Sequence, residues 1–241
     1  MKRIWNVARL QVVNRWTILW IPLMILGFIW LVNVALWWIL SSSLATEDFA
    51  DASSGMQWSG ASFYIFVYML VIAAQAMTMT FPYALGLSVT RREYYLGSLI
   101  AFVLLALTYG LLMTGLSFLE RATNGWGFGG TMFSAVYFGQ GPFLERLFVF
   151  AVAFLFFFIV GTFGGTIYMR WRTNGMLTAG AALIIVALAA VAVITLSESW
   201  PRVGEWFVAS GPTGVVAWML VPTALFSLAG YAALSRATPK S

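Results

Sequence analysis

The chain has 241 residues, of which 61% are hydrophobic and 9% are charged, and its mean hydropathy is +0.89. This composition excludes an ordinary soluble globular domain. Cysteine and histidine are both absent, which excludes disulfides, thiol nucleophiles and thiolate or imidazole metal sites. The net charge of +5 is carried at the ends of apolar stretches, so we expect it to meet anionic lipid or a cytoplasmic partner and not nucleic acid.

Residues 1–16 predict a helix that lies in the membrane surface. An apolar and a polar face alternate here with the helical period. The apolar face carries Trp5, Ala8, Val12 and Trp16, and the polar face carries Lys2, Asn6 and Arg9. Because Arg15 falls on the apolar side, a plain cytoplasmic extension of the next stretch is the alternative interpretation.

Six apolar stretches follow, each close to the ~20 residues that a helix needs to cross ~30 Å of hydrocarbon. They cover residues 16–40, 61–85, 96–119, 147–169, 176–196 and 214–234. Most basic residues lie in alternate gaps between the stretches, and most acidic residues lie in the other gaps. Because cytoplasmic segments retain Lys and Arg, both termini are predicted to be cytoplasmic. The fold class is therefore predicted to be all-α, a single polytopic domain over residues 1–241 with six transmembrane helices.

Two gaps on the predicted outer side differ in their signals. Residues 120–145 are rich in glycine and aromatic residues, which is typical of a segment at the membrane interface, but they predict no particular secondary structure. In residues 197–213, Ser199 is a candidate N-cap, Pro201 suits a first helical turn, and Gly211-Pro212 ends the run. We therefore expect a short amphipathic outer helix before the last stretch, with an irregular loop as the alternative.

Polar residues share one face of the second stretch. They are Tyr64, Tyr68, Gln75 and Thr78. This face either lines a substrate path or makes hydrogen bonds between helices. Pro82 in the same stretch predicts a kink, and the Gly-x-x-x-Gly motif of Gly161 and Gly165 predicts close helix packing in the fourth stretch.

Several kinds of chemistry are disfavoured. The middle of each stretch lacks charged residues, which disfavours an ion-driven carrier. Serine nucleophiles would lack a histidine partner, and a Ser–Lys dyad fails because Lys2 and Lys240, the only lysines, are terminal. Neither lysine lies in a Walker A motif. We expect no catalytic residue, no metal and no cofactor in this chain.

The gap of residues 86–97 carries the clearest local motif. Thr90 and Glu93 match the Ser/Thr-x-x-Glu capping box, which predicts a helix that begins at Arg91. Arg91 and Arg92 would then oppose the helix macrodipole, which suggests an anionic partner outside the helix. Topology-setting charges are the alternative interpretation. Tyr94 or Tyr95, just beyond, would provide an aromatic side chain to insert into a partner's groove.

In this layout the chain resembles the membrane subunits of type-two ATP-binding-cassette exporters. The resemblance covers the whole chain and is sharpest at residues 86–97, while residues 168–175 resemble that family's shorter second inner loop. It implies a coupling helix that docks on a separate cytoplasmic ATPase, which would bind ATP and Mg. The implied coupling residues are Thr90, Arg91, Arg92, Glu93, Tyr94 and Tyr95.

The resemblance also implies a bacterial or archaeal plasma membrane, a second permease subunit that is identical or related, and contact with membrane lipid. The expected function is export of an apolar or amphipathic substrate such as a drug, a peptide or a lipid, along a path lined by the polar face of the second stretch. Two alternatives remain, an ATP-independent channel or facilitator and a membrane immunity or assembly factor that transports nothing.

Overall fold

The computed structural model of the chain describes residues 2–43 and 55–235, and this part of the chain is helical without any strand. Lys240 therefore lies outside the described residues. Five helices are long and apolar enough to cross a membrane. They are Trp16–Ser43, Ala61–Gly86, Arg91–Ala122, Phe143–Leu196 and Trp200–Ser235. Their length and composition indicate a membrane protein.

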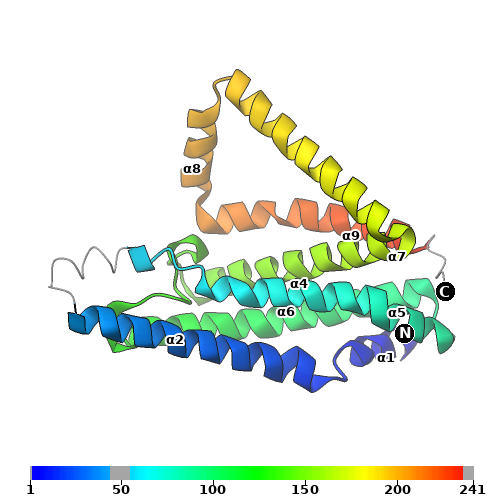
Figure 1. Cartoon of the computed structure of the whole chain (residues 1–241), viewed down its shortest axis with the longest axis horizontal. Coiled ribbons are helices and arrows are strands. Elements are labelled where there is room, and N and C mark those ends of the chain that lie inside the picture. The colour runs from blue at the N-terminus through cyan, green and yellow to red at the C-terminus, as the bar shows by residue number, and fades with distance from the viewer. Residues whose placement is uncertain (1, 44–54, 236–241) are drawn as a thin grey trace.

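The first half of the chain forms α1, α2, α4, α5 and α6 (Figure 1). The α-helices are α1 (Lys2–Gln11), α2 (Ile21–Ser43), α4 (Tyr64–Gln75), α5 (Phe81–Gly86) and α6 (Arg91–Ala122). Short π-helical turns precede α2 at Trp16–Trp20 and join α4 to α5 at Ala76–Thr80, and a 3-10 turn at Ala61–Phe63 precedes α4. A π-helical turn lies just before Pro82, where a kink was predicted, and proline cannot donate the backbone hydrogen bond of a regular helix.

The second half forms α7 (Phe143–Leu196), α8 (Trp200–Trp218) and α9 (Leu220–Ser235). The backbone of α7 leaves the helical region at Arg172, with φ 56° and ψ −148°, and the chain doubles back there (Figure 1). The fourth and fifth predicted stretches therefore form two arms of one helix with a single-residue break. The six predicted spans correspond to five candidate helices, of which α7 is folded on itself.

The core lies between α4, α6 and the first arm of α7. Phe102 and Phe158 stack with their ring centroids 5.0 Å apart and thus join α6 to α7. A Cβ on Gly161 would lie 2.1 Å from the Leu70 carbonyl oxygen, and one on Gly165 would lie 2.8 Å from that of Ala74. Both glycines therefore allow α7 to approach α4 closely, which confirms the packing predicted from their spacing.

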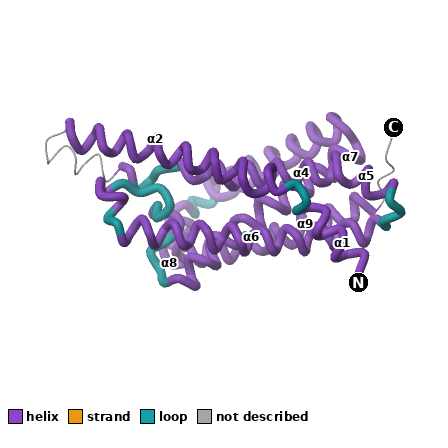
Figure 2. Tube along the Cα trace, turned by 90° about the horizontal axis from the view of Figure 1, so that it is seen from below, coloured by secondary structure: helices purple, strands orange, loops and turns teal. Residues whose placement is uncertain are grey.

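The first candidate span is offset along the bundle. Tyr68 donates a hydrogen bond to the Thr17 carbonyl oxygen at 2.7 Å, and Tyr109 donates to the Ile18 carbonyl oxygen. These bonds place the start of this helix about halfway along α6, and α1 lies beside the first turns of α6 (Figure 1). Most described loop residues gather at the opposite end of the bundle (Figure 2).

The second arm of α7 and the first part of α8 stand apart from the bundle (Figure 1), whereas the Thr213 hydroxyl, in the second part of α8, donates to the Glu145 carboxylate. Nearly all side chains of residues 176–196 are exposed. Residues 197–213, where a short helix was expected, contain the first part of α8, which breaks at Gly211 with φ 59°. Pro201 lies in its first turn as predicted, but the Ser199 side chain makes no capping bond, because its hydroxyl donates to the Ser197 carbonyl oxygen at 3.2 Å.

Candidate functional site

The predicted capping box is present at the start of α6. The Thr90 backbone is extended, and its hydroxyl accepts a hydrogen bond from the Glu93 backbone N–H at 3.2 Å. In return, the Glu93 carboxylate accepts from the Thr90 backbone N–H at 3.0 Å. The helix begins at Arg91, as predicted, so the loop of the segment 86–97 is confined to the few residues between α5 and α6.

Tyr94 ties the first turn of α6 to two other elements. Its hydroxyl donates to the Ala76 carbonyl oxygen of the π-helical turn at 2.5 Å and accepts from the Gln11 side-chain amide of α1 at 2.9 Å. The same amide donates to the Ser98 hydroxyl at 2.8 Å. Gln11 and Tyr94 are both buried, so these polar groups satisfy one another away from water.

Gly97 permits this contact between α1 and α6. A Cβ at this position would lie 2.6 Å from both the Ile4 carbonyl oxygen and the Val7 Cβ. No side chain fits there without a shift of the α1 backbone. The face that α1 buries against the rest of the chain consists of Val7, Ala8 and Gln11, whereas Trp5 of the predicted apolar face is 47% exposed. The helix also ends at Gln11, before the predicted boundary.

Tyr95 and Arg91 bind α6 to α9. The Tyr95 hydroxyl donates to the Ser227 carbonyl oxygen at 2.6 Å, and the Arg91 guanidinium donates to the Ser235 carbonyl oxygen at 2.8 Å. Ser235 is the last described residue of α9, and a positive charge is favourable near the C-terminal end of a helix. The start of α6 is thus in direct contact with α1, with the π-helical turn and with α9.

The six predicted coupling residues separate into an outer and an inner group. Thr90 and Arg92 are exposed, and Arg91 and Glu93 are half-buried. Tyr94 and Tyr95 are 0% and 2% exposed. The expectation that one of these rings would be presented to a partner's groove is therefore wrong in this conformation, because both rings are packed inside the chain. Tyr94, Gly97 and Ser98 lie at positions i, i+3 and i+4 and therefore share one face of α6. This spacing was the sequence signal that the face is buried.

The four predicted path residues do not form one open polar surface. Tyr64 and Tyr68 lie together with ring centroids 5.9 Å apart, and Tyr68 is bonded to the backbone near the start of the first span. Thr78 donates to the Ala74 carbonyl oxygen of its own helix at 3.0 Å. Gln75 is exposed. Helix contact thus accounts for Tyr68, whereas Gln75 presents its amide at the surface of the chain.

A buried carboxylate organises the outer segment, which the sequence left unassigned. Glu120, at the end of α6, accepts hydrogen bonds from three consecutive backbone N–H groups, those of Met132, Phe133 and Ser134, at 2.8–3.1 Å. The Ser134 hydroxyl and the Trp126 indole also donate to it. Side chains of this segment enter the core, and they include Met132, Phe133, Ala135 and Phe138. Residues 120–145 therefore form a cap whose backbone is hydrogen-bonded to the Glu120 carboxylate.

Arginine side chains close the other end of the cap. Arg146 is fully buried at the start of α7 and donates to the carbonyl oxygens of Gly139 and Phe133, each at 3.0 Å. Arg121 donates to the Gly139 carbonyl oxygen at 3.4 Å. Burial also raises the pKa of the Tyr137 phenol, which donates to the Ser59 carbonyl oxygen. The sequence signal for this segment was its glycines. Those at positions 125, 127, 129 and 139 have positive φ angles, which glycine adopts without strain.

The fold and these contacts define an all-helical protein with helices that can cross a membrane, built around a tightly connected start of α6 at one end and a folded cap at the other. No family model, curated protein or solved structure shows a significant match to the chain.

Proposed function

We propose that the chain is the membrane subunit of an ATP-driven exporter of the type-two ATP-binding-cassette class, and that the start of α6 receives the movement of a separate ATPase. The subunit would act with a second permease subunit, identical or related, in a bacterial or archaeal plasma membrane. Its spans would number six, with both arms of α7 crossing and both termini in the cytoplasm. The α1 helix would lie at the cytoplasmic membrane surface.

One observation carries this proposal, the set of hydrogen bonds at the start of α6. An element that transmits a push must contact the partner and must also be bonded to the helices that move. Arg92 is exposed beside the loop, and the adjacent side chains of Arg91, Tyr94 and Tyr95 are bonded to α9, α1 and the π-helical turn. A displacement of this turn therefore acts on three elements together.

The arrangement also suggests how the movement reaches the substrate path. Tyr94 bonds the carbonyl oxygen of Ala76, the residue after Gln75. The Ala76 carbonyl also accepts the backbone N–H of Phe81, which is the i to i+5 bond of the π-helical turn. Such turns are frequent at functional sites in helices. A shift of Tyr94 would thus alter the turn next to Gln75, whose exposed amide is the candidate contact for an amphipathic substrate.

The test asks whether a neighbouring gene encodes a Walker A ATPase and whether that ATPase co-purifies with this chain, followed by ATPase and transport assays in proteoliposomes. Arg91→Glu with Arg92→Glu should abolish docking and ATP-dependent transport, because the charge reversal repels an acidic docking groove. Arg202→Glu reverses an exposed charge near the start of α8, away from the start of α6, and should leave docking intact (Figure 1).

Gln75→Leu tests the proposed substrate path independently of the coupling residues. It should alter substrate-stimulated ATPase activity while the complex still assembles. Transport by the reconstituted chain alone, without ATP, would refute the proposal and support a channel or facilitator. Normal docking and transport by the loop variant would show that its arginines do not mediate coupling to an ATPase.

A further inference from the structure

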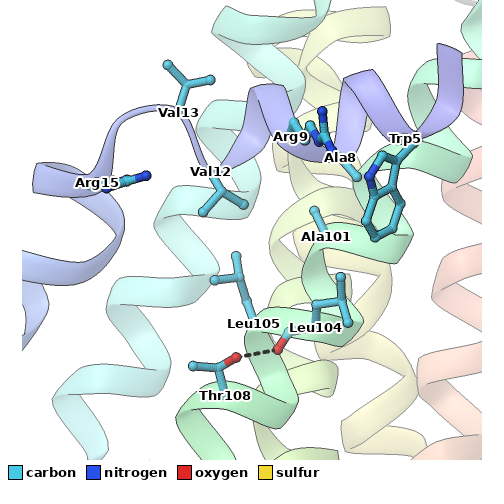
Figure 3. Close-up of a pocket in the computed structure, with 10 residues that line it drawn as sticks. All are labelled: Trp5, Ala8, Arg9, Val12, Val13, Arg15, Ala101, Leu104, Leu105 and Thr108. Atoms are coloured by element: carbon cyan, nitrogen blue, oxygen red, sulfur yellow. Dashed lines mark hydrogen bonds between the residues drawn. The ribbon is translucent and has the colours of Figure 1, made fainter. Parts of the chain in front are cut away.

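A groove opens where α1 turns into the first span. Residues 12–15 link the two helices, and α6 passes beneath this link (Figure 3). The cavity has a volume of about 590 Å³, which is within the usual size of a site for a small ligand. It is lined by Trp5, Ala8, Arg9, Val12, Val13, Arg15, Ala101, Leu104, Leu105 and Thr108.

The floor of the groove is apolar. Ala101, Leu104, Leu105 and Thr108 follow one another at i, i+3, i+4 and i+7 and form a continuous stripe along α6 (Figure 3). The Thr108 hydroxyl donates to the Leu104 carbonyl oxygen at 2.9 Å, so its polar group is already satisfied by its own helix. The stripe extends along the helix for roughly 10 Å at 1.5 Å per residue. Such a floor fits part of a hydrocarbon chain.

The rim of the groove is cationic. Arg9 of α1 and Arg15 at the start of the first span flank Val12 above the floor (Figure 3). Within the described part of the chain, neither guanidinium has a hydrogen-bonding or ion-pairing partner, and no acidic residue lines the groove. Both arginines are exposed, so they can bind an anion that comes from outside the chain.

Two tryptophans and the start of a candidate span surround this rim. Trp5 lines the groove, and Trp16 directly follows Arg15 with 65% of its side chain exposed. Exposed tryptophan is typical of the membrane–water interface. The first span also begins here, and the positive end of its helix macrodipole adds to the two arginine charges. Charge and apolar surface thus meet in the order of a phospholipid, headgroup above and chain below.

We infer that this groove binds one anionic glycerophospholipid, with its phosphate between Arg9 and Arg15 and one acyl chain along the α6 stripe. The lipid would bridge α1, the first span and α6, and so would fix the corner that positions Gln11 against Tyr94. The inference depends on the membrane location of the chain and not on the proposed transport function.

The test uses the purified full-length chain and native mass spectrometry, with phosphatidylglycerol and phosphatidylcholine of matched acyl chains added in equal amounts. The parent should retain one phosphatidylglycerol in preference to phosphatidylcholine. Arg9→Gln with Arg15→Gln should weaken the phosphatidylglycerol adduct about 30-fold, from the usual effect of two cations near an anionic lipid surface. Lys2→Gln with Arg3→Gln removes two cations from the same region outside the groove and should retain the adduct.

Leu104→Trp distinguishes a site for a phospholipid from a site for free phosphate. Leu104 is exposed on the groove floor, so the larger side chain fills the groove while both arginines and the helix remain. This variant should also lose the phosphatidylglycerol adduct, whereas a site for free phosphate would be unaffected. Equal retention of both lipids by the parent, or equal loss with the two double variants, would overturn the inference. Retention of phosphatidylglycerol by Leu104→Trp would overturn it as well.

Discussion

Substitution of Gly97 by alanine tests whether the contact between α1 and α6 holds the start of α6 in place. The new Cβ would lie 2.6 Å from the Ile4 carbonyl oxygen and 2.6 Å from the Val7 Cβ. Ordinary contact between such atoms is near 3.5 Å, so the α1 backbone must move by roughly 1 Å. The bonds from Gln11 to Tyr94 and Ser98, now 2.9 and 2.8 Å long, would then be too long to count as hydrogen bonds.

The expected cost follows from these contacts. Overpacking costs about 1–3 kcal/mol and each lost hydrogen bond about 0.5–1.5 kcal/mol, while alanine gains about 1 kcal/mol over glycine in a helix. The net destabilisation is therefore about 3 kcal/mol, which corresponds to a fall in melting temperature of about 6–12 °C. Thermal unfolding in detergent measures this fall, and hydrogen exchange should show faster exchange in α1 (Lys2–Gln11).

Gly115→Ala is the matched control on the same helix. A Cβ there meets nothing within 4 Å, so this variant should be as stable as the parent or slightly more stable. Unchanged exchange in α1 of Gly97→Ala, together with an unchanged melting temperature, would refute the role of Gly97 as the contact point.

Three further predictions concern the rest of the bundle. Glu120→Gln should destabilise the cap by about 2–4 kcal/mol, because the buried carboxylate loses its charge-assisted hydrogen bonds. Limited proteolysis should then cleave within residues 125–141. The control is Glu205→Gln, which changes an exposed carboxylate and should not allow this cleavage. Gly161→Ala should lower the melting temperature, because its Cβ would lie 2.1 Å from the Leu70 carbonyl oxygen, whereas Gly164→Ala meets nothing within 4 Å and should not. Single cysteines at Arg92 and Glu205 in this cysteine-free chain should label from opposite faces of the membrane, and labelling from one face would contradict the proposed topology.

The features that could be predicted from the sequence are those set by near neighbours in the chain. The capping box of Thr90 and Glu93 needs residues three positions apart, and the motif of Gly161 and Gly165 needs residues four apart, so both were recognisable. The bond from Gln11 to Tyr94 joins residues 83 positions apart. Which partner a polar side chain on a helix finds at that separation depends on how the helices are offset, and no local pattern encodes that offset.

The cap was unpredictable for a related reason. Its backbone is neither helix nor strand for most of its length, so it lacks a hydrophobic period. Its shape depends instead on one carboxylate, that of Glu120, which accepts backbone N–H groups 12 to 14 residues further along. The glycines of the segment indicated only that positive φ angles were possible there.

The two arginines at the start of α6 have different surroundings, so they should have separable roles. Arg91 donates to the last described carbonyl of α9, whereas Arg92 is exposed beside it. Arg91→Gln should therefore loosen the end of α9, seen as faster hydrogen exchange in Leu220–Ser235, even when no ATPase is present. Arg92→Gln should leave this exchange unchanged and should weaken only the docking of the ATPase, measured by co-purification. If Arg92→Gln instead accelerates exchange in α9 as much as Arg91→Gln, the division of roles fails, because both arginines would then act within the chain.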